Sequence, residues 1–574
     1  MTTVSGSFLR ALAVGLAAIL LSGCAQPPPE SSTNPAATAP ADEPRRPRGT
    51  LRIAWGTEPE TLSPKLGVGA GLANYQWMFD SYLTYFDAEG RSHPMLAKAN
   101  PTQVGGDWVV NADGTMVTTY RLRENARWHD GTPITARDYV LAFEIHMDPE
   151  MPVRDRVPET FVAKIEARDD HTLVIAWRQP YIGAGTLTYQ QITPLPAHLV
   201  EEKYRRNKAS FAFGAEWTSS YVGTGPFRIE RWNPGSSLVA RAFVDWVLGP
   251  PRVETVEVRF ISDSSTQVAN ILAGEIDLIS SPWASAQDAD VIRKQWALRN
   301  EGYIKTGLRS IHFLAFQFRE VPNWQSAVAD LRVRKALMHA TDRSALTDVM
   351  TAGLGGIADA FTVPTGLLFP EIDAAVTKYP YDLNRSTALL AETGWNRSTR
   401  TALLTNSTGQ TLDIELWDTP GGDETSAILA DNWKAAGINT SSYTIPAARQ
   451  RDLELRVSFP AVNESSRSAT LDNFAYSSKH LPTAENRWQG GNRGSFRDAE
   501  VDRLYDLAMT TIPERERQRA IVGLHRRMSE TLGIGPLYYN AQVLIARNRL
   551  KGPFGETAEK SGVTWNIFEW EVID

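Results

Sequence analysis

Three side chains suited to metal binding or proton transfer stand close together in the sequence, at Glu144, His146 and Asp148. Carboxylates and imidazoles are common ligands of metal ions. The stretch from residue 135 to residue 146 has the pattern of a helix, however, and residues two apart on a helix point in different directions. We therefore expect that these three side chains do not share one metal ion.

The sequence lacks the usual motifs of nucleotide, hydrolase and zinc chemistry. It contains no G-x-x-x-x-G-K-[ST], no G-x-S-x-G and no H-E-x-x-H. No pair among the 66 acidic residues stands out as the two carboxylates of a glycosidase. We therefore assign no catalytic residue, no metal and no cofactor, and we expect that the protein is not an enzyme.

One thiol is present, because Cys24 is the only cysteine. It follows an apolar run over residues 11–21, which is too short to cross a membrane but typical of a signal peptide. The sequence Leu21-Ser22-Gly23-Cys24 resembles a bacterial lipobox, in which the thiol receives diacylglycerol and the chain is cut before the cysteine. We predict a lipoprotein signal peptide at 1–23 and lipidation at Cys24. A plain secretory signal is the alternative.

Residues 24–49 are rich in Pro, Ala and Ser, a composition that favours an extended tether. The remaining chain alternates strand and helix patterns and shows no fixed-period repeat. Strands are predicted at 50–55, 118–122, 172–177, 227–231, 256–261 and 411–417. Helices are predicted to begin at caps Thr135, Asp330, Asp382 and Asp498, and further helices are expected over 425–437 and 513–531.

The composition is that of a folded soluble protein of 574 residues, with 42% hydrophobic and 22% charged residues. It excludes a largely disordered chain and a protein with many membrane spans. The net charge of −7 gives no sign of nucleic-acid binding.

Five stretches resemble, in order, the motifs of the family 5 extracellular solute-binding proteins, which are the peptide and nickel receptors of ABC importers. They are residues 122–138, the Gly-Thr-Gly-Pro-aromatic turn at 222–227, the Leu-x-x-Gly-Glu-x-Asp helix end at 271–277, residues 330–343, and residues 381–395.

The resemblance implies an α/β, two-lobed fold of the periplasmic-binding-protein class, with an extra subdomain in lobe I and the ligand between the lobes. Mapped onto this chain, lobe I is 50–310 with an extra subdomain at about 76–205, lobe II is 311–536, and residues 537–574 return to lobe I.

The resemblance also suggests where ligand contacts lie. Peptide receptors of the family carry a Trp and an Asp-Pro pair in lobe II, where an acid pairs with the free amine of the peptide. Here the comparable stretches, 459–465 and 470–474, lack both, and Asp472 and Glu464 are the candidate replacements. The candidate ligand-binding residues are Trp55, Glu58, Trp417, Asp472, Trp488, Asn492 and Arg493.

We therefore expect a monomeric, lipid-anchored receptor on the extracytoplasmic face of the cell membrane. It would bind a peptide or another small polar solute and deliver it to ABC permease subunits by lobe closure. The alternatives are a receptor for an oligosaccharide or a chelated metal, a secreted hydrolase, and a purely structural surface protein.

Overall fold

The computed structural model describes residues 46–66, 71–153, 156–364, 366–399, 402–419, 421–450, 452–468, 476–553 and 562–573. Cys24, the predicted signal peptide, nearly all of the predicted tether and Asp472 lie outside these residues. Pro44–Asp574 forms one compact unit, and all the helices and strands described belong to it.

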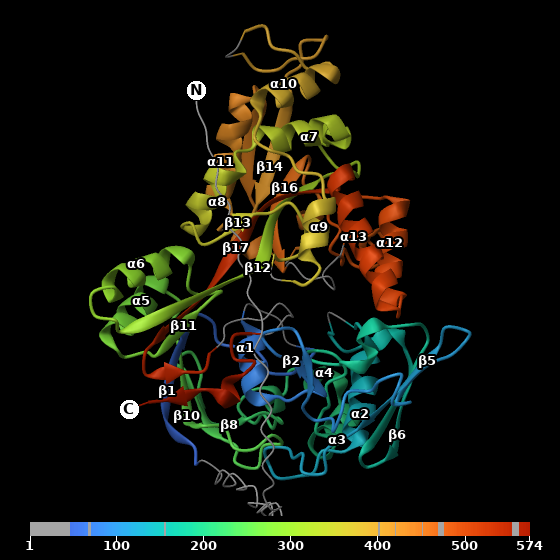
Figure 1. The fold of residues 1–574 in the computed structure, drawn as a ribbon, viewed down its shortest axis with the longest axis vertical. Coiled ribbons are helices and arrows are strands. Elements are labelled where there is room, and N and C mark those ends of the chain that lie inside the picture. Colours follow the sequence, from blue (N-terminus) through green and yellow to red (C-terminus); the bar gives the residue numbers. More distant parts are fainter. Residues whose placement is uncertain are drawn as a thin grey trace, which may run out of the picture. The chain divides into compact units, whose positions relative to one another are not determined.

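A mixed sheet runs through both halves of this unit (Figure 1). One half contains β1 (Arg48–Trp55), which pairs in parallel with β10 (Val253–Phe260) and β11 (Leu278–Ser280). Antiparallel β9 (Ser237–Ala242) and β8 (Phe227–Asn233) continue this half. We call this half lobe I.

The other half, lobe II, contains β14 (Asp413–Asp418), which pairs in parallel with β15 (Asn439–Thr444) and β16 (Val462–Ser468). Two long antiparallel strands join the halves. They are β12 (Gly302–Phe316), which pairs with β16, and β17 (Ile534–Arg547), which pairs with β11. The chain is thus an α/β protein of two lobes linked by two strands, as predicted. The expected boundaries at 310 and 536 fall inside β12 and β17 and stay predictions.

A separate four-stranded sheet lies within the stretch predicted as an extra subdomain. Its order is β4 (Trp108–Val110), β5 (Met116–Arg121), β7 (Thr172–Trp177) and β6 (Val162–Asp169). The buried aromatic side chains Tyr120, Trp128 and Trp177 form part of its core.

Most predicted helix starts are confirmed. Thr135 and Asp138 form a capping box at α2 (Ala136–Met147), and side chains of Asp330, Asp382 and Asp498 cap α7 (Leu331–Ala340), α10 (Leu383–Glu392) and α12 (Ala499–Thr510). One prediction was wrong in detail, because α11 (Asp423–Ala435) begins after Gly422 and not at Thr425. Thr425 is buried inside the helix, where its hydroxyl contacts that of Tyr538 at 3.2 Å.

The remaining elements complete the two lobes. The other helices are α1 (Leu72–Phe79), α3 (Ala197–Arg206), α4 (Lys208–Phe211), α5 (Ser264–Ala273), α6 (Ala286–Trp296), α8 (Arg343–Thr351), α9 (Phe369–Ala375) and α13 (Glu514–Thr531). The short strands are β2 (Thr84–Phe86), β3 (Ser92–Pro94), β13 (Gly356–Ile357), β18 (Leu550–Lys551) and β19 (Glu571–Val572).

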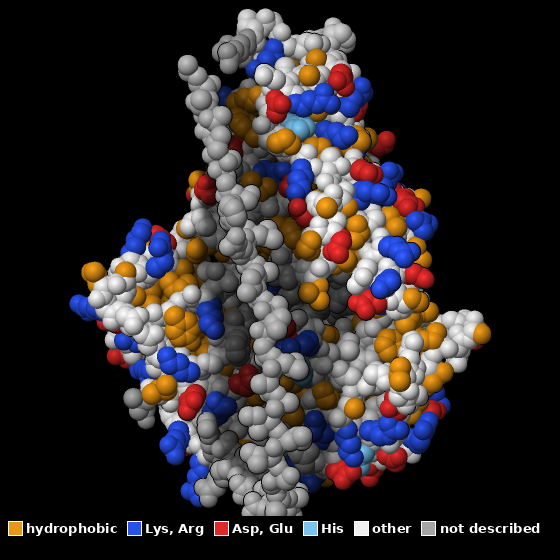
Figure 2. Space-filling view, in the orientation of Figure 1, with side chains coloured by type: hydrophobic (Ala, Val, Ile, Leu, Met, Phe, Trp, Pro, Cys, Tyr) orange, Lys and Arg blue, Asp and Glu red, His pale blue; other side chains and the backbone are white. Residues whose placement is uncertain are grey.

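The surface mixes both signs of charge. Figure 2 shows Lys and Arg side chains interspersed with Asp and Glu over α12 and α13. Many of these are salt bridges between exposed side chains, such as Arg503 with Glu500 at 2.7 Å. Among the described helices, none combines the length and the apolar character that a membrane crossing requires.

Candidate functional site

The two candidate residues of lobe I belong to a tightly packed aromatic group. Trp55 ends β1 and is fully buried, with its ring 4.5 Å from that of Tyr75 and 5.5 Å from that of Trp283. The carboxylate of Glu58 accepts hydrogen bonds from Trp232 Nε1 at 2.5 Å and from the backbone N–H of Gly235 at 2.7 Å. The carboxylate of Glu58 is thus hydrogen-bonded within the protein, whereas Trp55 Nε1 is buried with no hydrogen-bond partner among the described residues. A ligand contact for either side chain stays a prediction.

Two candidates of lobe II lie on the neighbouring strands β14 and β16. Trp417, near the end of β14, donates from Nε1 to Glu415 Oε1 at 2.6 Å and packs against Tyr443. Glu464 lies in β16 and is only 4% exposed. Its carboxylate bonds to His312 Nδ1 at 2.7 Å, and that imidazole stacks on the ring of Tyr538. Glu464 is therefore an acid with a protein partner already in place.

Asn492 organises the segment that follows. Its Nδ2 donates to the backbone oxygens of Tyr476, Ser477 and Phe496, at 3.1, 3.1 and 2.7 Å. Its Oδ1 accepts from the backbone N–H of Phe496 at 2.9 Å. A buried amide with this many bonds fixes the backbone around it. The structure thus gives Asn492 a role in positioning the chain beside Arg493.

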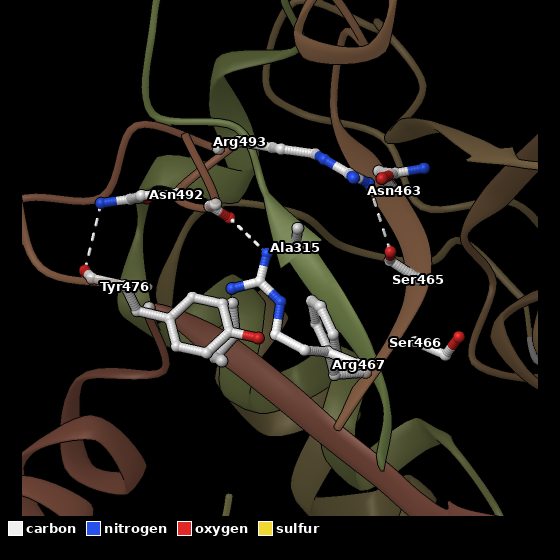
Figure 3. Close-up of a pocket in the computed structure, with 13 residues that line it drawn as sticks. Ala315, Asn463, Ser465, Ser466, Arg467, Tyr476, Asn492 and Arg493 are labelled. Carbon is white, nitrogen blue, oxygen red and sulfur yellow. Dashed lines mark hydrogen bonds between the residues drawn. The ribbon is translucent and has the colours of Figure 1, made fainter. Parts of the chain in front are cut away.

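A pocket of about 60 Å³ lies between this segment and the sheet of lobe II (Figure 3). Alternate residues of β16, namely Asn463, Ser465 and Arg467, contribute to its wall because alternate side chains of a strand face the same side. Arg493 closes it from the other side. The space suits a small polar group or a few water molecules.

Two guanidinium groups enter this pocket. Arg493 Nη1 donates to Ser465 Oγ at 3.4 Å, which is a long bond. Arg467 Nη2 donates to the backbone oxygen of Gly491 at 3.4 Å, and its guanidinium lies 5.2 Å from the ring centre of Tyr476 (Figure 3). The pocket is therefore lined by two cations, hydroxyls and an amide.

Arg493 is held in an unfavourable setting for a cation. Burial lowers the pKa of its guanidinium to about 9, and the nearby charges of Arg456 and Arg467 add to this effect. That pKa is still above neutral, so the group keeps its charge at pH 7. A cation that is largely removed from water and has like-charged neighbours costs free energy unless an anion is added.

Trp488 lies next to this pocket. Its ring faces the guanidinium of Arg319, whose central carbon is 5.3 Å from the ring centre. Trp488 and Arg493 both line a neighbouring pocket of about 210 Å³, which Arg456 also lines. The structure therefore brings Trp488, Asn492 and Arg493 together in one place, away from Trp55 and Glu58 in lobe I.

The sequence analysis missed Arg467 and Tyr476. Residues 462–468 form a strand, which was not predicted, and its alternation places Asn463, Ser465 and Arg467 on the pocket side. The strand reads Val-Asn-Glu-Ser-Ser-Arg-Ser, which has no alternation of apolar and polar residues, so its sequence gave no strand signal. Tyr476 had no local signal, because it is placed beside the pocket by the bond that its backbone oxygen accepts from Asn492.

Comparison with known proteins identifies the family of this chain. Residues 93–484, more than half of the chain, match the bacterial extracellular solute-binding proteins, family 5 (Middle). The chain belongs to this family. A similar protein of Brucella melitensis biotype 1, which bears the provisional name of ABC transporter peptide-binding protein, is 23% identical over 471 residues, covering 79% of this chain and 82% of that protein.

Solved structures of the family have the same fold with different ligands. An oligopeptide-binding protein of Thermus thermophilus, complexed with a pentapeptide, superposes with a TM-score of 0.74 at 23% identity, over 91% of this chain and 96% of that one. NikZ of Campylobacter jejuni, in complex with Ni(L-His), gives a TM-score of 0.73 at 21% identity, over 91% of this chain and 99% of that one. The fold is therefore shared, and the ligand must be argued from this chain's own residues.

Proposed function

We propose that this protein is the substrate-binding component of an ABC importer that captures a peptide-like solute outside the cytoplasm. The observation that carries the proposal is the family match over residues 93–484. The provisional name of the Brucella melitensis relative and the pentapeptide complex of the Thermus protein support peptides as the first class of solute to test.

The mechanism we propose is closure of the two lobes around the solute. The lobes are linked by β12 and β17, so that small changes along these two strands would move one lobe relative to the other. A solute that touches both lobes only in the closed state shifts the population toward that state. The permease can then distinguish loaded from empty receptor. No step in this scheme requires catalysis by the protein.

A chelated metal is the second candidate solute, because the Campylobacter neighbour was solved with Ni(L-His). Among the described residues, no group of three or more His, Cys, Asp or Glu side chains is placed to hold a metal ion. A metal would therefore arrive with a chelator that supplies its ligands.

The binding proposal is tested with the mature protein and three pools of solutes: tetrapeptides, oligosaccharides and nickel–histidine. We expect the tetrapeptide pool to raise the melting temperature, since a ligand that binds only the folded state stabilises it. Scattering at saturation should then show a smaller radius of gyration. Stabilisation by sugars or nickel–histidine alone would contradict the peptide assignment.

The anchoring part of the proposal concerns Cys24, and we propose that it carries the lipid. Cys24→Ala removes the only thiol in the chain. We expect the variant to lose labelling by radioactive palmitate and to leave the membrane fraction, since two or more acyl chains are needed for stable anchoring. A variant that is still processed and membrane-bound would refute the lipobox interpretation.

A further inference from the structure

We propose that a groove between α9 and α13 on lobe II docks the permease, and that it receives a segment with acidic and apolar side chains. The inference rests on the proposed function, because a permease is the protein partner which that function requires. The two helices contact each other on one side of lobe II (Figure 1). None of the residues that line this groove lines the two pockets beside Arg493. The groove is therefore a separate surface.

The groove offers a protein segment an apolar wall. Its volume is about 540 Å³, which is within the usual range of concave binding sites. Leu368 at the start of α9, Ala375 within α9 and Val522 of α13 line it, and all three are half-buried. Leu367, which precedes Leu368 in the chain, is 97% exposed. A partner that covered these side chains would remove apolar surface from water, which favours association.

The charged side chains of the groove favour an acidic partner segment. Arg515, Arg519 and Arg526 line it, and Glu371 is the one acidic residue among the described residues that do so. All four are exposed. Arg519 and Arg526 follow Arg515 by 4 and 11 positions, so the three arginines share one face of α13 over about 16 Å. A segment with Asp and Glu side chains along that length would match the charge of the groove.

The groove arginines differ from another arginine of the same helix in their pairing. Arg527 of α13 contacts Asp498, the N-cap of α12, at 2.7 Å. In the groove, Arg526 is 3.9 Å from Glu530, which is a long contact between exposed side chains. The other two groove arginines make no ion pair and no side-chain hydrogen bond with any residue that the structure describes. Their paired N–H groups therefore remain available to the carboxylates of a partner.

The position of α13 connects the groove to the movement of the lobes. α13 ends at Thr531, and β17, one of the two strands that link the lobes, begins at Ile534. Leu524 of α13 lies in the same hydrophobic core cluster as Ile311 of β12 and Tyr539 of β17. A permease segment bound in the groove would therefore contact the helix that continues into a linking strand. Docking and closure would then influence each other, because coupling between two sites is reciprocal.

The first test is photocrosslinking in intact cells that contain the full chain, with the photoreactive amino acid benzoylphenylalanine in place of Leu367. Peptides joined to this position are identified by mass spectrometry. We expect a permease segment that carries Asp or Glu side chains beside apolar ones. The same replacement at Leu298, which is 92% exposed and lies in lobe I, is the control and should not capture that segment. Products from Leu367 that contain no permease segment would overturn the inference.

The second test reverses the charge of the groove with the double variant Arg515→Glu and Arg519→Glu. In vesicles that contain the permease, the receptor concentration for half-maximal ATP hydrolysis should rise at least about 10-fold, because like charges then face each other. Raising the salt from about 0.05 M to about 0.5 M should have a similar effect on the wild-type protein, since exposed charges are screened. Arg503→Glu is the matched control, because Arg503 is exposed, pairs with Glu500 and does not line the groove.

This result separates the inference from the proposed function. Solute binding by the double variant, measured by calorimetry, should equal that of the wild-type protein. Normal solute binding together with unchanged stimulation of the permease would overturn the inference and leave the proposed function intact. If no solute binds the wild-type protein, the proposed function fails, and the crosslinks from Leu367 still decide whether the groove contacts a permease.

An anionic membrane surface is the other occupant that arginines beside leucines would suit. Its test is flotation of the Cys24→Ala protein, which we expect to lack the lipid anchor, with phosphatidylcholine vesicles that contain about 30% phosphatidylglycerol. We expect no binding, because a concave groove matches a protein segment better than a flat surface. Vesicle binding that the charge reversal at Arg515 and Arg519 removes would assign the groove to the membrane and overturn the inference.

Discussion

The aromatic group around Trp55 in lobe I is closely packed, whereas two arginines of lobe II line an open pocket. Trp55 is fully enclosed, and the nearby carboxylate of Glu58 has two short hydrogen bonds. In lobe II, Arg493 makes one hydrogen bond of 3.4 Å, and the like charges of Arg456 and Arg467 lower its pKa. In the first region the protein supplies the partners of Glu58, and only the buried Trp55 Nε1 has no hydrogen-bond partner among the described residues of that group. In the second, the described neighbours of Arg493 supply no carboxylate to balance its charge.

The candidates came from the family resemblance together with residue type, and the structure now separates them by their surroundings. Trp55 is enclosed by other aromatic rings, whereas Arg493 lines a pocket. Substitutions in the first region should therefore cost more stability than substitutions in the second.

The largest effect is expected from Trp55→Ala. Removing a fully buried Trp should lower the free energy of unfolding by about 3–5 kcal/mol. Trp488→Ala is the matched change in lobe II, where the half-buried ring faces Arg319, and should cost about 1 kcal/mol or less. Urea unfolding of both variants measures the difference. Equal losses would show that the two regions are packed alike.

Gly494→Ala should come next, with a loss of about 3 kcal/mol. A Cβ at this position would lie 1.9 Å from the backbone oxygen of Phe316, so the segment that carries Arg493 must move away from β12. Gly307→Ala, within β12 but facing open space, is the control and should be neutral. Urea unfolding of both variants measures the difference. Equal stability of the two variants would show that the segment shifts without cost.

The sequence predicted the framework better than the site, for physical reasons. Helix caps such as Asp330 and Asp382 act within three residues, so their signals are local. The family motifs likewise specify turns and helix ends. The pocket depends instead on distant contacts, since Asn492 must bond to Tyr476 and Arg493 must reach Ser465. No local pattern encodes those pairs, and the partners of Glu58 lie 174 and 177 residues away.

A buried histidine gives lobe I a pH dependence that the arginine pocket lacks near neutrality. His129 Nε2 bonds to the backbone oxygen of Gly225 at 3.0 Å, and Nδ1 accepts from the N–H of Gly223 at 3.1 Å. Both bonds together require the neutral ring. Burial lowers the pKa of His129 to about 4, below the ordinary value, so the unfolded chain binds the proton first.

Stability should therefore be lost as the pH falls from about 6.5 toward 4, by up to about 3 kcal/mol. Asp80 has the opposite sign, because burial raises its pKa to about 7 and its contribution weakens as the pH rises. The measurement is thus the difference in unfolding free energy between wild-type protein and His129→Gln across this range. A pH-independent difference would contradict the neutral-ring assignment.

The smallest effect on stability is expected at Arg493 itself, and it separates the two regions most sharply. Arg493→Met keeps much of the side-chain volume and removes the charge. The loss is one long hydrogen bond to Ser465, and the gain is relief from the charges of Arg456 and Arg467. We therefore expect the free energy of unfolding to change by less than about 1 kcal/mol. Urea unfolding of the wild-type protein and the variant measures this change. A loss of about 3 kcal/mol in the free protein would mean that Arg493 is paired within the fold, as expected when one partner of a buried ion pair is removed. Arg493 would then resemble Glu58, a charged group whose hydrogen-bond partners come from the protein itself, and the difference between the two regions would disappear.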